Sequence, residues 1–133
     1  MLLNVTDQSN ESLQSQIIRQ IRARILSGEI AESESLPSIR GLAKQLQVSV
    51  ITIQRGYESL EREGLIVSRR GKGFFAERLT EQKRTRLSRQ RLAEQIGPVI
   101  RAAKAEGMSP EEIRDTILEM MERLTVESPT RRP

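Results

Sequence analysis

The 133-residue sequence contains no cysteine, no histidine and no tryptophan, and it has aspartate only at Asp7 and Asp115. Disulfide bonds are therefore excluded. The thiolate and imidazole groups that most often bind metals or act as nucleophiles and general bases are also absent. This composition argues against an enzyme and predicts that the protein needs no metal and no cofactor. The lack of cysteine fits a reducing compartment.

Long apolar segments are missing as well. No run approaches the roughly 20 residues needed to cross a membrane, and the N-terminal stretch MLLNVTDQSN has no signal-peptide features. We therefore expect a cytoplasmic protein with no membrane partner. Aromatic residues are limited to Tyr57, Phe74 and Phe75. A small chain with so few large side chains is expected to bury part of its surface against a second copy.

The charge is positive overall and unevenly distributed. The net charge is +4. Residues 1–11 contribute −2, residues 12–76 carry ten Lys/Arg against six Glu (+4), and residues 77–133 carry twelve against ten acids (+2). The excess of cations in residues 12–76 favours an anionic partner for that region.

The N-terminal third begins with residues 1–9, which show no periodic pattern and are predicted to form a loose arm. A helix is predicted from about residue 10, capped by Ser9 or Asn10 and ended by Gly28. Its apolar residues recur every four positions, whereas its arginines fall largely on other faces. The apolar set is Leu13, Ile17, Ile21 and Ile25, and the arginines are Arg19, Arg22 and Arg24.

Two closely spaced helices follow. Ser38 is a natural N-cap for a short helix that runs to about Gln45, and the stretch QVS separates it from a longer helix over about residues 50–63. The segment LIVSRRGKGFFA then predicts a β-hairpin with its turn at Gly71-Lys72-Gly73. This order of elements is that of a winged helix-turn-helix, so the fold class is mainly α with a small β-hairpin.

A winged helix-turn-helix places the start of its second helix in the DNA major groove and its hairpin against the backbone. We therefore expect double-stranded DNA as the partner. The expected contacts come from the second helix, from the start of the preceding helix and from the hairpin: Ser49, Val50, Ile51, Thr52 and Gln54; Ser38 and Arg40; Arg69, Arg70 and Lys72. The hydroxyl groups also suit helix caps, and both roles can hold for the same residue.

The C-terminal half is strongly charged and helical in pattern. Residues 80–106 predict either one kinked helix or two helices, because Gly97-Pro98 interrupts the run. The stretch SPEE at 109–112 predicts a capped helix start. Sparse apolar positions in both segments suit a dimer interface: Leu87, Leu92, Ile96, Ile113, Ile117, Met120, Met121 and Leu124. The predicted organisation is a DNA-binding domain (1–76), a two-helix dimerisation region (77–126) and a disordered tail (127–133).

Residues 36–76 resemble the DNA-binding domain of the GntR family of bacterial transcription regulators. The matching motifs are LPSxR, LAxxLxVS, TxxRxYexLexeGL and RRGKG, in order and at the right spacing. The short tail is similar to that of the YtrA subfamily. This resemblance implies a homodimeric repressor, genes beside ABC transporters, and DNA contacts by Arg40, Ser49, Thr52, Gln54, Arg70 and Gly71.

Four positions depart from the family pattern. Gly41 replaces the usual Glu, Gly56 replaces Ala, and apolar Val50 and Ile51 stand where polar or basic residues are common. The two apolar residues can touch thymine methyl groups but cannot hydrogen-bond to bases. The alternative to a DNA-binding regulator is a protein-interaction module. A third hypothesis, a sensor with a pocket at the dimer junction, is compatible with the DNA-binding regulator, and its small-molecule effector is unknown.

Overall fold

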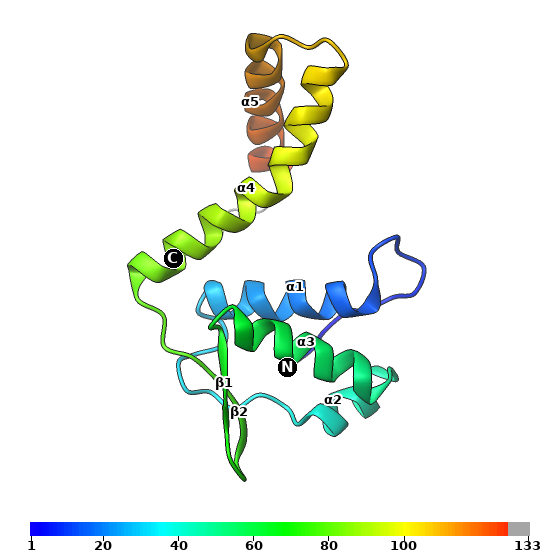
Figure 1. Cartoon of the computed structure of the whole chain (residues 1–133), viewed down its shortest axis with the longest axis vertical. Helices are drawn as coiled ribbons and strands as arrows, with labels where there is room; N and C mark the ends of the chain where they lie inside the picture. The colour runs from blue at the N-terminus through cyan, green and yellow to red at the C-terminus, as the bar shows by residue number, and fades with distance from the viewer. Residues whose placement is uncertain (128–133) are drawn as a thin grey trace. The chain divides into compact units, whose positions relative to one another are not determined.

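A computed structural model describes residues 1–127 and confirms a mainly helical fold with one hairpin (Figure 1). The chain divides into two compact units, Met1–Arg86 and the residues from Leu87 onward. The elements in chain order are α1 (Leu13–Leu26), α2 (Ile39–Leu46), α3 (Val50–Arg62), β1 (Ile66–Arg69), β2 (Gly73–Ala76), α4 (Glu81–Ala105) and α5 (Pro110–Glu127).

The core of the first unit lies between α1 and α3, with α2 and the hairpin packed against α3. In Figure 1, α1 lies above α3, whereas α2 and the hairpin extend below it. The apolar faces predicted from the spacing meet here, and burial of aliphatic and aromatic side chains is the main stabilising contribution. The fully buried side chains are Ile17, Ile21, Leu42, Ile53, Tyr57, Leu60, Leu65 and Ile66.

Arg22 differs from the sequence prediction, which placed it away from the buried face of its helix. It is buried and forms a two-point ion pair with Glu63, at 2.9 Å from Nε to Oε1 and 2.6 Å from Nη2 to Oε2. A planar guanidinium matches a carboxylate in this geometry. The pair therefore joins α1 to the C-terminal end of α3.

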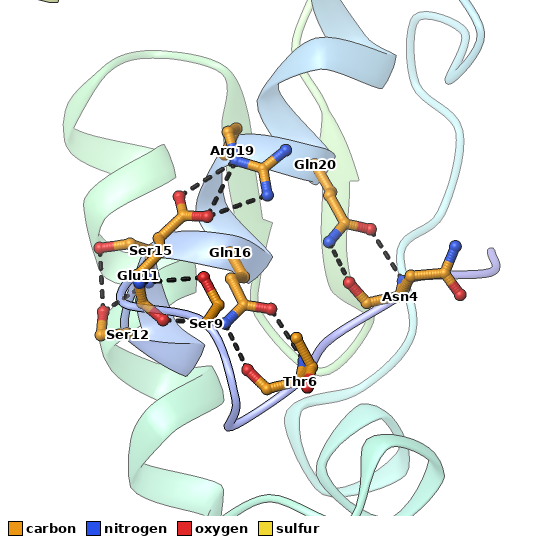
Figure 2. A network of polar contacts seen from close by, with 9 residues as sticks. All are labelled: Asn4, Thr6, Ser9, Glu11, Ser12, Ser15, Gln16, Arg19 and Gln20. Carbon is orange, nitrogen blue, oxygen red and sulfur yellow. Dashed lines mark hydrogen bonds and ion pairs between the residues drawn. The ribbon is translucent and has the colours of Figure 1, made fainter.

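The N-terminal segment was expected to be a loose arm, and this prediction was wrong. Leu3 is buried, and the backbone of Asn4 and Thr6 is hydrogen-bonded to glutamines of α1 (Figure 2). The helix also starts later than predicted. Its N-cap is Ser12, whose Oγ accepts a hydrogen bond from Ser15 N at 3.0 Å. The helix cannot start earlier because the residues before Ser12 form the segment that folds back along α1.

The hairpin pairs β1 with β2 in antiparallel register, with Val67 opposite Phe75 and Arg69 opposite Gly73. The connection before α2 also pairs with the hairpin, through an isolated β-bridge that the sequence pattern did not reveal. Ser35 forms a bridge with Phe75, and Leu36 N donates to Phe74 O at 2.9 Å. This pairing fixes the chain immediately before α2 against the hairpin.

The first unit extends past the predicted boundary at residue 76. Glu77 N donates to Leu65 O at 2.9 Å, and Lys83 Nζ donates to Gly64 O at 3.1 Å. These bonds attach the segment leading into α4, and the first turn of α4, to the turn between α3 and β1. As a result, the division between the two units falls inside α4, after Arg86.

The second unit is a helical hairpin in which α5 runs back alongside the last turns of α4 (Figure 1). Helix α4 continues through Pro98, so the segment is a single helix rather than two. Ser109 and Glu112 form the predicted capping box, with bonds of 3.0 and 3.1 Å. Helix α5 includes Glu127, the first residue of the predicted disordered tail, and the rest of that tail lies outside the described residues.

Candidate nucleic-acid interface

Two N-caps and one left-handed residue define the turn between α2 and α3. Ser38 Oγ accepts from Gly41 N at 3.0 Å at the start of α2, and Ser49 Oγ accepts from Thr52 N at 3.1 Å at the start of α3. Between the helices, Gln47 adopts φ 57° and its N–H bonds to carbonyls of α2. A left-handed residue at this position reverses the chain within a few residues, which holds α3 rigidly against α2.

The first turn of α3 exposes the residues that the sequence predicted. The side chains of Val50 and Ile51 are 43% and 52% exposed, which is unusual for aliphatic residues next to a buried core. Thr52 is half-buried, and its hydroxyl lies 2.8 Å from that of Ser49. Gln54 is exposed, and its amide donates to Glu58 at 3.2 Å one turn along the helix.

Arg40 is exposed at the start of α2, and within residues 1–127 it forms no hydrogen bond or ion pair. Two further cations that sequence reasoning did not select share these properties, namely Lys44 on α2 and Arg55 on α3. The signal for Lys44 was present in the sequence, because it follows Arg40 by four residues and therefore lies on the same face of the helix.

The hairpin supplies a second group of cations. Arg70, Gly71 and Lys72 form the exposed loop, and Gly71 has φ +73° with open space around its Cα. Arg69 lies in β1 rather than at the tip, and its guanidinium is 4.9 Å from the centre of the Phe75 ring. This cation–π contact orients Arg69 along the hairpin, so the loop itself presents Arg70 and Lys72.

Tyr57 joins the three parts of this surface. Its hydroxyl donates to Pro37 O at 2.7 Å, and its ring meets Phe74 edge-on with centroids 4.9 Å apart. The side chain is fully buried, and burial raises the pKa of its phenol. A single residue of α3 therefore contacts both the segment that leads into α2 and the second strand of the hairpin, as expected for a core tyrosine.

Comparisons with known proteins agree with this geometry. The family described as "Bacterial regulatory proteins, gntR family" matches residues 13–76. The uncharacterized HTH-type transcriptional regulator YhcF of Bacillus subtilis is 34% identical over 83% of this chain and 90% of its own length. The chain belongs to the gntR family. The similar curated proteins are described as transcription regulators. This gntR chain is therefore a transcription regulator and not an enzyme.

The similarity extends beyond the winged helix-turn-helix of the gntR chain. The HTH-type transcriptional repressor YtrA of Bacillus subtilis is 29% identical over 90% of this chain and 92% of its own length. A GntR family transcriptional regulator from Listeria monocytogenes has a solved structure with a TM-score of 0.70, 25% identity, and coverage of 86% of this chain and 98% of that chain. None of the helices within residues 1–127 is long and apolar enough to cross a membrane.

The second unit places the predicted dimerisation residues in different environments. Leu92, Met120, Met121 and Leu124 are about half exposed or more, whereas Leu87, Ile96 and Ile117 are partly covered. Ile113 is 8% exposed, so it belongs to the interior of the helical hairpin. Three exposed apolar residues of the described part of this unit were not predicted, Val99 on α4 and Leu118 and Val126 on α5.

Proposed function

We propose that two copies of this gntR regulator bind a pseudo-palindromic DNA operator and repress transcription from it. The observation that supports this proposal most directly is the first turn of α3, where Val50 and Ile51 are exposed. Arg40 at the start of α2 is also exposed and has no hydrogen bond or ion pair within residues 1–127. Exposed aliphatic side chains on a helix end are costly in water. They are accounted for if that helix end enters the major groove, which is wide enough for an α-helix.

The residues of this face have complementary chemistry toward DNA. Val50 and Ile51 suit the methyl groups of thymine, whereas Arg40 suits a guanine edge or a phosphate. The amide of Gln54 can read adenine once it leaves Glu58, an exposed partner whose bond costs little to break. Ser49 is exposed, and its hydroxyl can form one further hydrogen bond while it keeps its capping bond from Thr52 N and its contact with the Thr52 hydroxyl.

The hairpin adds contacts that do not depend on base sequence. Arg70 and Lys72 flank Gly71, whose backbone has open space around it and can approach a phosphate closely. Each cation that neutralises a phosphate releases condensed counterions, so the affinity for DNA should fall steeply as the salt concentration rises.

The exposed apolar residues of the second unit support the proposed dimer. They can be buried against a second copy, and a two-fold symmetric dimer presents two copies of α3 to two half-sites. The name of the relative YtrA describes a repressor, and we extend that role to this chain. Control of an ABC transporter operon, which the family resemblance implies, stays a prediction to be tested by measuring expression in a deletion strain.

A fluorescence-anisotropy titration tests the proposal. DNA from upstream of the protein's own gene is compared with a scrambled duplex at several salt concentrations. We expect selective binding to the upstream DNA that saturates at two chains per duplex. Equal and weak binding to both duplexes, lost at moderate salt, would show that the operator does not lie upstream of the protein's own gene. If the protein then prefers no DNA fragment in a genomic selection, the proposal of an operator-binding regulator is overturned in favour of a winged helix that binds a protein partner.

Arg40→Ala tests the residue with the clearest predicted role. We expect operator affinity to fall by roughly 1–3 kcal/mol, with specificity relaxed at one base position if the guanidinium contacts a base. Arg62→Ala is the matched control, because Arg62 is an exposed arginine at the C-terminal end of α3, away from the first turn that is proposed to enter the major groove. Unchanged operator affinity in Arg40→Ala, or an equal loss in both variants, would refute the role given to Arg40.

A further inference from the structure

The N-terminal segment is attached to α1 by two glutamine side chains that imitate a β-strand (Figure 2). Gln20 Oε1 accepts from Asn4 N at 2.9 Å, and Gln20 Nε2 donates to Asn4 O at 2.5 Å. Gln16 repeats the arrangement on Thr6, at 2.8 and 2.6 Å. Each amide therefore satisfies both backbone groups of one residue, as a neighbouring strand would.

The spacing of these residues explains why the segment has a fixed register. Residues two apart in an extended chain are separated by about 6.6 Å, and residues four apart on a helix by about 6 Å. Asn4 and Thr6 thus match Gln20 and Gln16. A shift of the segment by one residue would leave both amides facing backbone groups that point away. The cost would fall mainly on Gln16, whose side chain is buried.

The other end of the segment reaches α2. Gln45 Nε2 donates to Met1 O at 3.2 Å. Met1 also lines a shallow cavity with Leu36 and Pro37, the residues that lead into α2. Helix α2 otherwise packs mainly against α3. Residues 1–6, hereafter the strap, therefore give α2 a second attachment, which runs back to α1.

We propose that the strap positions α2 for DNA binding, with Gln16, Gln20 and Gln45 as positioning residues that never touch DNA. This inference rests on the proposed function. Helix α2 is only eight residues long and carries Arg40 and Lys44 on its exposed side. With the strap in place, both cations are held relative to α3. Without the strap, α2 is held only by its packing against α3. Binding that depends on base sequence should then weaken more than the general electrostatic attraction to DNA.

Gln20→Glu is the variant that tests the strap with the least change of shape. The carboxylate can still accept from Asn4 N, but its second oxygen faces Asn4 O and repels it. Gln14→Glu is the matched control, because Gln14 lies on the same helix and has no side-chain hydrogen bond within residues 1–127. Gln45→Ala is the second test variant. It removes the attachment at α2 from an exposed position, so it should still fold.

Three measurements separate positioning from general stability: the ratio of scrambled to operator dissociation constants, thermal unfolding, and amide hydrogen exchange. We expect Gln20→Glu and Gln45→Ala to lower the ratio about fivefold to tenfold, and to speed hydrogen exchange of α2 amides. Gln14→Glu should change neither. A lower unfolding temperature with an unchanged ratio and unchanged α2 exchange would reduce the strap to a stability element and overturn the inference.

The exchange measurement also distinguishes failure of the strap from failure of the proposed function. If the wild-type chain does not prefer operator DNA but α2 exchange still accelerates in both variants, the DNA proposal fails and the mechanical role of the strap stands. If the wild-type chain prefers operator DNA and both variants retain that preference, the strap inference fails alone.

Discussion

The two units of the chain differ in how completely they bury their apolar side chains. In the first unit, residues of α1, α2, α3 and the hairpin enclose a core in which eight large side chains are almost completely inaccessible. Among the described residues of the second unit, 87–127, only Ile113 is buried, and the exposed apolar residues include Leu92, Met121 and Leu124. The first unit has a hydrophobic core of its own, whereas the described part of the second has almost none.

This difference in burial suggests different roles for the two units, a rigid binding surface in the first and association in the second. A unit with a closed core can hold polar residues rigidly at its surface, as α3 and the hairpin do. A helical hairpin with its apolar residues in water gains stability mainly by burying them against another surface. We therefore expect mutations in the first unit to act on unfolding, and mutations in the second to act on association. The predictions below test this contrast, from the largest expected effect to the smallest.

Leu60→Ala should give the largest effect, because it opens a cavity in the closed core. Leu60 is fully buried on α3, and truncation of such a leucine costs about 2–5 kcal/mol. The measurement is urea unfolding followed by circular dichroism. Leu118→Ala makes the same chemical change at an exposed position of α5 and should change the unfolding of the first unit by less than about 0.5 kcal/mol. Similar losses in both variants would abolish the contrast between the units.

Leu124→Glu should act on association instead. Burial of a leucine contributes about 1.5–3 kcal/mol, so a charge at this position should raise the dimer dissociation constant by about 10- to 100-fold. Analytical ultracentrifugation over a concentration series measures it. Val126→Glu is the matched control. Val126 is an exposed aliphatic residue two positions further, about 200° around the helix. A dimer that tolerates Leu124→Glu but not Val126→Glu would place the interface on the other face of α5.

Gly56→Ala should stabilise the first unit modestly. Gly56 lies inside α3, and a Cβ there would meet Ile18 Cγ1 at 3.6 Å and Ile17 Cγ2 at 3.8 Å, which are ordinary contacts. Removing a helical glycine should then raise the free energy of unfolding by about 0.5–1 kcal/mol. At Gly41 a Cβ would lie 2.8 Å from the capping Ser38 Oγ, so Gly41→Ala should gain less. A loss of stability in Gly56→Ala would contradict the ordinary contacts expected for the added Cβ between α1 and α3.

The same contrast explains what the sequence revealed. Apolar periodicity identified the helices of the first unit, because residues such as Ile17, Ile21 and Tyr57 are buried by their own chain. The family motifs identified the winged helix-turn-helix. Exposed positions on α4 and α5 were correctly seen as sparse apolar points, but spacing alone did not show that Ile113 is already covered within the hairpin.

Polar side chains that bind distant backbone were not predictable. Arg22 meets Glu63 across 41 positions of sequence, and nothing local to either residue marks the pair. Gln16 and Gln20 look like ordinary surface residues of a helix, because their partners are backbone groups of a segment without periodic pattern. For the same reason residues 1–9 were interpreted as a loose arm. At the interface, the sequence selected Arg40 through its motif. Arg55 stands at the arginine of the motif TxxRxY but was not selected as a contact, and Lys44 falls at an unspecified position of its motif.

Glu112 should show the smallest effect, confined to the second unit. Hydrogen bonds from the backbone and side chain of Ser109 lower the pKa of the Glu112 carboxyl below its ordinary value. A lowered pKa in the folded state means that the stabilisation is complete above the unfolded-state pKa and is lost as the pH falls through the folded one. Carbon-detected NMR titration of the Glu112 carboxyl should give a midpoint below that of an unstructured glutamate, and Ser109→Ala should raise it. Because the carboxyl is solvent-exposed, Glu112→Gln should remove only a slight acid dependence from the helicity of α5. A strong acid dependence that survives Glu112→Gln would mean that another group, such as one buried between two chains, controls the second unit.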